Sequence, residues 1–139
     1  MTDDAREGFP ALSCSTIVLR AATRQKQIDE ENRRLTPVAY ELRDSTGERE
    51  VSVGLADVCS AAEFHKPENC HQRDVKGVGS NHVGWVRAAG LDVVQDARDH
   101  AGIVGLHDLD PIRRYQAQED LSFRSRLVWH HRWPDGGDG

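Results

Sequence analysis

The segment 91–106 constrains the fold of this chain more than any other. Two short apolar runs, Val93-Val94 and 103–106, flank a polar stretch. The titratable residues of that stretch are Asp96, Arg98, Asp99 and His100. Short apolar runs bounded by polar residues are typical of buried strands, so the segment predicts a β-hairpin with its polar residues at the edge of a sheet. Titratable groups at such an edge are where a functional site is expected.

A second hairpin is predicted upstream. Residues 36–44 alternate, with Val38, Tyr40 and Leu42 on one face, and residues 50–54 alternate again. The intervening Asp44-Ser45-Thr46-Gly47 has the composition of a turn, because Asp and Ser bond their own backbone and Gly accepts a positive φ. Period-two alternation on both sides of a turn indicates paired strands.

The remaining segments predict a mixture of elements. Residues 12–19 are rich in β-branched side chains and predict a strand. Helices are expected over 21–35, 55–65 and 80–89, and from Asp110 to about Asp120, where Asp-Pro is a typical helix start. Residues 122–131 are compatible with a strand or a continued helix, and the helix is the favoured interpretation.

Together these elements predict an α+β fold: one mostly antiparallel sheet of four to five strands built from hairpins, with helices covering one face. The 139 residues suit one domain. We expect this domain to occupy residues 12–133. Residues 1–11 and 134–139 are rich in Asp, Gly and Pro and are expected to be disordered tails.

The composition argues against several classes of partner and cellular compartment. A net charge of −5 argues against generic nucleic-acid binding. The three cysteines, Cys14, Cys59 and Cys70, are an odd number without paired spacing, which argues against a secreted disulfide scaffold. The early apolar run is too short for a signal peptide or a membrane span. We therefore expect a cytoplasmic protein without a membrane partner.

His100 is the candidate for proton transfer, because histidine titrates near neutral pH. Asp96 or Asp99 would orient its ring, and Arg34 or Arg98 would hold an anionic group, which suits hydrolysis of a phosphoester-like substrate. The alternative is a purely structural turn in which the imidazole bonds a backbone carbonyl.

The sequence gives less support to a metal site or a catalytic thiol than to proton transfer by His100. Cys59, His65, Cys70 and His71 lie close in sequence, but their spacing does not match known zinc-ligand patterns. We expect no metal and no cofactor, and a zinc-stabilised module is the weaker alternative. Cys70 beside His71 is the better candidate for a reactive thiol.

The C-terminal region carries the composition of an interface. Its aromatic and basic residues are Arg126, Trp129, Arg132 and Trp133, and tryptophan with arginine is typical of interface anchors. The leading hypothesis is therefore a small accessory or protein-interaction domain. Its partner would be another protein, with the products of neighbouring genes as first candidates, and a homo-oligomer is left open. A His-dependent hydrolase is the alternative.

A set of short motifs adds a resemblance. These are Arg33-Arg34-Leu35-Thr36-Pro37, the segment 51–56, a helix ending at Gly90-Leu91, and Asp96-x-x-x-His100-Ala101-x-Ile103-x-Gly105. With them, residues 33–128 resemble small uncharacterised bacterial proteins. The resemblance draws attention to Arg34, Asp96 and His100 but implies no activity. The chain departs from the pattern at Ala97, where proline is expected, which puts the shape of that loop in question.

Overall fold

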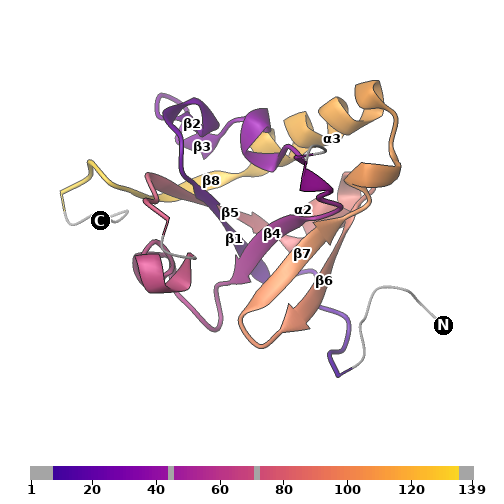
Figure 1. Cartoon of the computed structure of the whole chain (residues 1–139), viewed down its shortest axis with the longest axis horizontal. Helices are drawn as coiled ribbons and strands as arrows, with labels where there is room; N and C mark the ends of the chain where they lie inside the picture. The colour runs from indigo at the N-terminus through magenta and orange to yellow at the C-terminus, as the bar shows by residue number, and fades with distance from the viewer. Residues whose placement is uncertain (1–7, 44–45, 71–72, 135–139) are drawn as a thin grey trace.

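The computed structural model describes residues 8–43, 46–70 and 73–134 (Figure 1). Residues 1–7 and 135–139, which make up most of the expected tails, lie outside the described residues. The strands are β1 (Ile17–Ala22), β2 (Ile28–Asp29), β3 (Arg34–Leu35), β4 (Val51–Leu55), β5 (Gly77–His82), β6 (Asp92–Ala97), β7 (His100–Val104) and β8 (Arg126–His130). The helices are α1 (Ala61–Phe64), α2 (Val83–Ala88) and α3 (Pro111–Arg124).

The main sheet has the strand order β6-β7-β4-β1-β5-β8, and every neighbouring pair is antiparallel. The α+β class with a mostly antiparallel sheet is therefore confirmed. The sheet has six strands within the described residues, where the sequence predicted four to five. The predicted hairpin at 91–106 is present as β6 and β7, with Val93 opposite Ile103.

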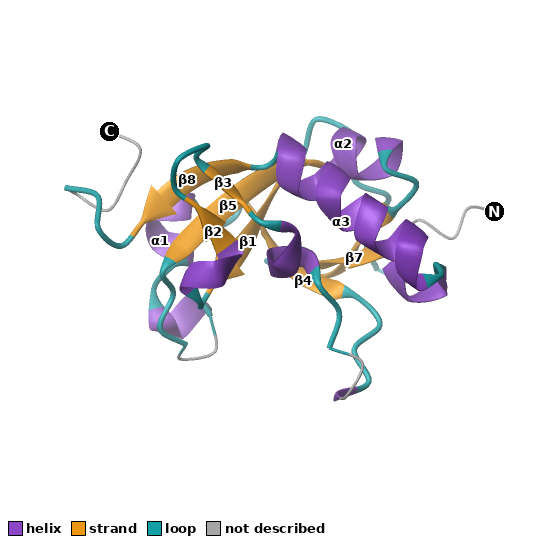
Figure 2. Cartoon of the chain, turned by 90° about the horizontal axis from the view of Figure 1, so that it is seen from above, coloured by secondary structure: helices purple, strands orange, loops and turns teal. Residues whose placement is uncertain are grey.

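Helices lie on both faces of this sheet, not on one. Val18 and Leu19 are consecutive in β1 and therefore point to opposite faces. Val18 packs in the cluster that includes Val86 of α2 and Leu121 of α3, whereas Leu19 packs in the cluster that Phe64 of α1 joins. Figure 2 shows α2 and α3 side by side and α1 apart from them.

No described helix combines the length and the apolar composition needed to cross a bilayer.

The hairpin expected over residues 36–54 does not form, because the strand expected in its first half is absent. Residues Pro37–Tyr40 form a 3-10 helix instead of a strand. Pro37 occupies the first turn, where its fixed φ favours a helical conformation. Tyr40 and Leu42 are still buried, as the alternation indicated, but β4 pairs with β7 and β1. The region 21–35 is likewise not a helix, since it contains a 3-10 turn and the small hairpin β2–β3.

The favoured helix over 122–131 is also wrong. Helix α3 ends at Arg124, Ser125 turns to an extended conformation, and β8 begins at Arg126. The hydroxyl of Ser122 donates to the Leu35 carbonyl at 2.8 Å, and the Leu35 amide donates to the Ser125 hydroxyl at 3.0 Å. These buried bonds join the end of α3 to β3 and so fix where the helix stops.

His130 at the end of β8 gives a prediction about acid stability. Its side chain is 1% exposed, and its Nδ1 accepts from the Arg132 amide at 3.1 Å. Burial lowers the pKa of His130 from its ordinary value, so the unfolded chain binds this proton more readily than the folded one. Stability should therefore fall as pH drops below about 6.5. In His130→Asn, the deficit in unfolding free energy relative to wild type should shrink from pH 8 to pH 5.5 in urea melts. A pH-independent deficit would contradict this.

Candidate functional site

Asp96 and His100 form a close pair at one end of the β6–β7 hairpin. His100 Nδ1 lies 2.6 Å from Asp96 Oδ1, and the side chains are 34% and 30% exposed. A contact this short between an imidazole and a carboxylate is a charge-assisted or strong hydrogen bond. With Nδ1 engaged by the carboxylate, Nε2 is the ring nitrogen that remains for other chemistry.

A β-bulge lies at the pair. Gln95 pairs with Ala101 and Ala97 pairs with His100, so Asp96 is the extra residue between them. Bulges redirect side chains and occur often beside functional sites. In a regular ladder Asp96 would lie directly opposite His100, and the two side chains would still be neighbours. The bulge instead places Ala97 opposite His100 and shortens the turn to Arg98-Asp99.

His100 lines a hollow of about 290 Å³. Gly54, its cross-strand partner in β4, forms part of the floor. A Cβ at Gly54 would overlap the ring of Phe64, and one at Gly102 would overlap the carboxylate of Glu50. Gly54 thus lets the Phe64 ring of α1 pack directly on the sheet, where it forms a wall of the hollow.

Arg20 reaches this hollow through a split in the sheet. The register of β1 with β4 consists of two pairs, Val18 with Leu55 and Leu19 with Gly54. Beyond them the strands separate, and the guanidinium of Arg20 lies in the gap. Its Nε donates to the Ala39 carbonyl at 2.8 Å and its Nη1 to the Ser52 carbonyl at 3.0 Å. Two of its five N–H groups are thereby fixed.

The guanidinium of Arg20 carries a positive charge in a partly buried position. Burial lowers the pKa of Arg20 from its ordinary value, but an arginine side chain stays protonated in proteins. Within the described part of the chain, its hydrogen-bond partners are backbone carbonyls and not carboxylates. Glu48 acts on this charge, and the hollow is lined by two carboxylates, Glu68 and Asp99, as well as by Arg20 and Arg73. An anionic ligand at the hollow would therefore have to contact the Arg20 guanidinium directly, through a charge-assisted hydrogen bond. The sequence analysis missed Arg20, although a single arginine within the apolar run of β1 was a visible signal.

Cys70 also lines the hollow but does not act as a nucleophile. The side chain is buried, and its Sγ donates to the Phe64 carbonyl at 2.9 Å. Burial raises the pKa of the Cys70 thiol, which disfavours the reactive thiolate. The buried position of Cys70 gives no support to the prediction of a reactive thiol, and His71 lies outside the described residues. The described residues contain no group of His, Cys, Asp and Glu arranged to hold a metal ion.

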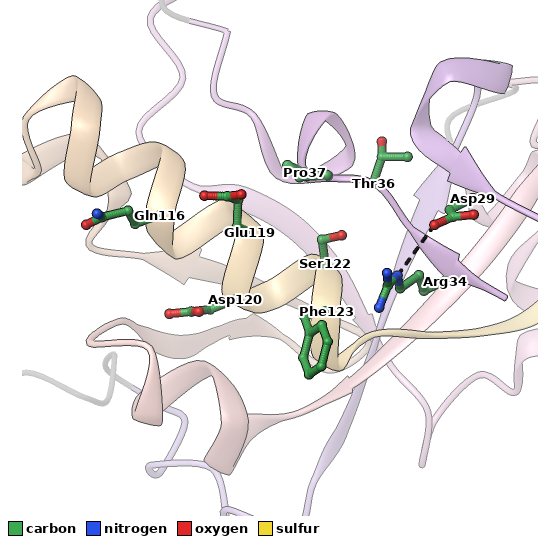
Figure 3. A pocket seen from close by; sticks show the side chains of 9 residues that line it. All are labelled: Asp29, Arg34, Thr36, Pro37, Gln116, Glu119, Asp120, Ser122 and Phe123. Atoms are coloured by element: carbon green, nitrogen blue, oxygen red, sulfur yellow. Dashed lines mark ion pairs between the residues drawn. The ribbon is translucent and has the colours of Figure 1, made fainter. Parts of the chain in front are cut away.

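The predicted anion-binding arginines are elsewhere. Arg98 is exposed in the hairpin turn and does not line the hollow, whereas its neighbour Asp99 does. Arg34 in β3 forms an ion pair with Asp29 at 3.5 Å and lies 5.3 Å from the ring centroid of Phe123 (Figure 3). The expectation that Arg34 meets His100 is wrong, because β2 and β3 form a separate hairpin outside the main sheet.

The hollow that Arg34 lines is the larger one, at about 700 Å³, but its charge is unfavourable for anions. Figure 3 shows Asp29, Glu119 and Asp120 around it, together with the one arginine. Since Arg34 is already paired with Asp29, the lining is predominantly acidic. This region therefore repels the anionic ligands that the Arg20 hollow would attract.

The expected aromatic interface is not an exposed patch. Trp129 is 8% exposed and stacks on His65, with ring centroids 3.9 Å apart. Trp133 is partly buried against the main core, and Arg33 lies 5.2 Å from its ring centroid. Arg126 and Arg132 are exposed, as expected. The exposed large apolar side chains on α3 are instead Ile112, Tyr115 and Phe123, and the interaction hypothesis stays a prediction.

Comparisons with protein-family models, curated proteins and solved structures give no match to this chain. The resemblance to small bacterial proteins therefore stays a prediction. The arguments for function come from the geometry at His100.

Proposed function

We propose that the chain is a His-dependent hydrolase that acts on an anionic, phosphoester-like substrate. The observation that carries the proposal is the Asp96–His100 contact of 2.6 Å at a hollow that Arg20 also lines. A carboxylate-oriented imidazole supplies a general base, and a desolvated guanidinium supplies an electrostatic partner for negative charge. The two functions are combined in one concave site of about 290 Å³.

In the proposed reaction, His100 removes a proton from the attacking water through Nε2. The water oxygen forms a bond to phosphorus as the bond from phosphorus to the ester oxygen breaks. The departing oxygen takes up the proton that the imidazolium of His100 carries on Nε2, which returns the ring to its neutral form. Asp96 accepts a hydrogen bond from Nδ1–H and stabilises the imidazolium that forms. Arg20 donates to the phosphoryl oxygens, where negative charge develops during the displacement. The carbonyls of Ala39 and Ser52 hold the guanidinium in place and so lower the cost of reorganisation.

The test is an assay with p-nitrophenyl phosphate, bis(p-nitrophenyl) phosphate and the neutral p-nitrophenyl acetate. The wild-type chain should hydrolyse at least one phosphoester and should prefer it to the acetate. Asp96→Asn should lower kcat by more than about tenfold and by up to about 10⁴-fold, the loss seen when a carboxylate that orients a general-base histidine is replaced by an amide. Its KM should change little, because Asp96 positions the ring and does not contact substrate.

Two results would overturn the proposal. One is the absence of turnover of all three compounds by folded wild-type protein. The other is an Asp96→Asn variant whose kcat equals that of wild type, since a structural carboxylate would leave catalysis unaffected. Matching far-UV circular dichroism spectra of the two proteins would show that any difference in kcat is not caused by unfolding.

A further inference from the structure

A second hollow lies beside the candidate site and shares residues with it. It has a volume of about 410 Å³ and is lined partly by the 3-10 turn at 25–27 and the segment 38–43. Arg20 and Arg73 line both this hollow and the one that contains His100. Arg20 lies where the β1–β4 pairing ends, and its Nη1 donates to the Ser52 carbonyl of β4, so its side chain is a boundary between the two hollows. We call this second region the basic hollow.

The basic hollow concentrates positive charge in a protein whose net charge is −5. Its cationic side chains are Arg20, Arg24, Lys26, Arg43 and Arg73. Two carboxylates also line it, and one of them, Asp74, lies 3.4 Å from Lys76 Nζ. The local excess of cations is therefore opposite in sign to the rest of the surface, and low-dielectric walls strengthen the attraction of anions to such a concave region.

Polar contacts hold the backbone of the 3-10 turn that carries Arg24 and Lys26, whereas Arg43 forms an ion pair with Glu48 at 3.8 Å. Gln27 Oε1 accepts from the Thr23 amide at 2.9 Å and from the Arg24 amide at 3.1 Å. The Lys26 carbonyl accepts from the Thr36 hydroxyl at 2.8 Å. These contacts fix the turn on which Arg24 and Lys26 lie, so both side chains project from a rigid base.

We propose that the basic hollow is a phosphate-binding subsite, and that the ligand is a di- or oligophosphate with phosphates on both sides of Arg20. A hollow of about 410 Å³ exceeds the need of one phosphate and falls in the range of small-molecule sites. Guanidinium groups bind phosphate oxygens in bidentate geometry, and the shared Arg20 can contact two neighbouring phosphates. The substrate class deepens the proposed function and rests on it, whereas binding at the hollow can be measured without turnover.

The charges favour a small polyanion over a nucleic acid. A nucleic-acid surface is an extended basic patch or stripe on a basic domain, whereas here the cations are gathered in one hollow of an acidic chain. Among the residues that the structure describes, those that line the basic hollow include no aromatic side chain on which a base could stack.

The test is isothermal titration calorimetry of the full chain with sodium tripolyphosphate at low ionic strength. Wild type should bind, and the double variant Arg24→Gln/Lys26→Gln should bind about tenfold or more weakly, because two charge-assisted contacts are lost. Both residues are exposed, so the fold should be retained. The matched control is Arg113→Gln/Arg124→Gln, which removes the same charge from exposed positions of α3 and should change the affinity less than twofold.

The binding and turnover results distinguish the phosphate-binding subsite from the proposed hydrolase. No binding to wild type, equal weakening in both double variants, or tighter binding of a single-stranded oligonucleotide than of tripolyphosphate would overturn the subsite. His100→Gln should bind tripolyphosphate within about threefold of wild type, because the proposed role of the ring is proton transfer and the phosphates are held by the arginine and lysine side chains. Turnover without tripolyphosphate binding would reject the subsite alone, whereas binding without turnover in wild type would reject the proposed hydrolase alone.

Discussion

His100→Gln is expected to lower kcat/KM for the phosphoester that wild type uses by about 10²–10⁴-fold, the usual contribution of a positioned acid–base group. Glutamine keeps a polar side chain but cannot take up a proton near neutral pH. Because the ring lines the hollow and pairs with Asp96 at 2.6 Å, the loss should be mainly in kcat. Initial-rate kinetics over a range of substrate concentrations measures the effect.

His107→Gln is the matched control for this prediction. His107 is exposed in the 3-10 helix that follows β7 and does not line the hollow. The same substitution there should leave kcat/KM within about twofold of wild type, as expected for a surface position away from the reacting groups. Equal losses in the two variants would mean that His100 has no special role, and an unchanged rate in His100→Gln would remove it from the mechanism.

Ile103→Ala is expected to lower the free energy of unfolding by about 2–5 kcal/mol, the range for removing a large aliphatic side chain from a packed core. Ile103 is fully buried in β7, between Val51 of β4 and Val93 of β6. Few residues can move to fill the space, because the neighbours belong to hydrogen-bonded strands. Urea denaturation at constant temperature gives the value by linear extrapolation.

The same substitution at Ile112 provides the comparison. Ile112 is 73% exposed on α3, and alanine has the higher helix propensity. Ile112→Ala should therefore change stability by less than about 0.5 kcal/mol. Similar losses at both positions would contradict the placement of β7 in the core, and with it the support of the strand that carries His100.

The hairpin that carries the site was predictable, because its two apolar runs are separated by a short polar stretch. The same segment left Asp96 and Asp99 as alternative partners of His100, and the structure places Asp96 against the ring. The 36–44 region was mistaken for a strand because Val38, Tyr40 and Leu42 alternate over a span too short to distinguish a strand from a 3-10 turn. Pro37 was the competing signal, since proline at the first position of a helical turn is favoured.

The anion-binding partner could not be found by sequence proximity. Arg34 was chosen from a motif, but it lies in the separate β2–β3 hairpin, paired with Asp29. Arg20 reaches His100's hollow only because β1 and β4 separate after two residue pairs. Such a split depends on the pairing of strands that are 35 residues apart at Leu19 and Gly54, and local patterns carry no information about it.

The central claim is that Asp96 holds the His100 ring by Nδ1 and leaves Nε2 as the base. The most direct measurement is a long-range ¹H–¹⁵N NMR spectrum of the uniformly labelled chain with the imidazoles neutral, with His100 assigned by the loss of its signals in His100→Gln. The account predicts the tautomer with the proton on Nδ1 in wild type, and its loss as the dominant form in Asp96→Asn. A wild-type ring with its proton on Nε2 would contradict it.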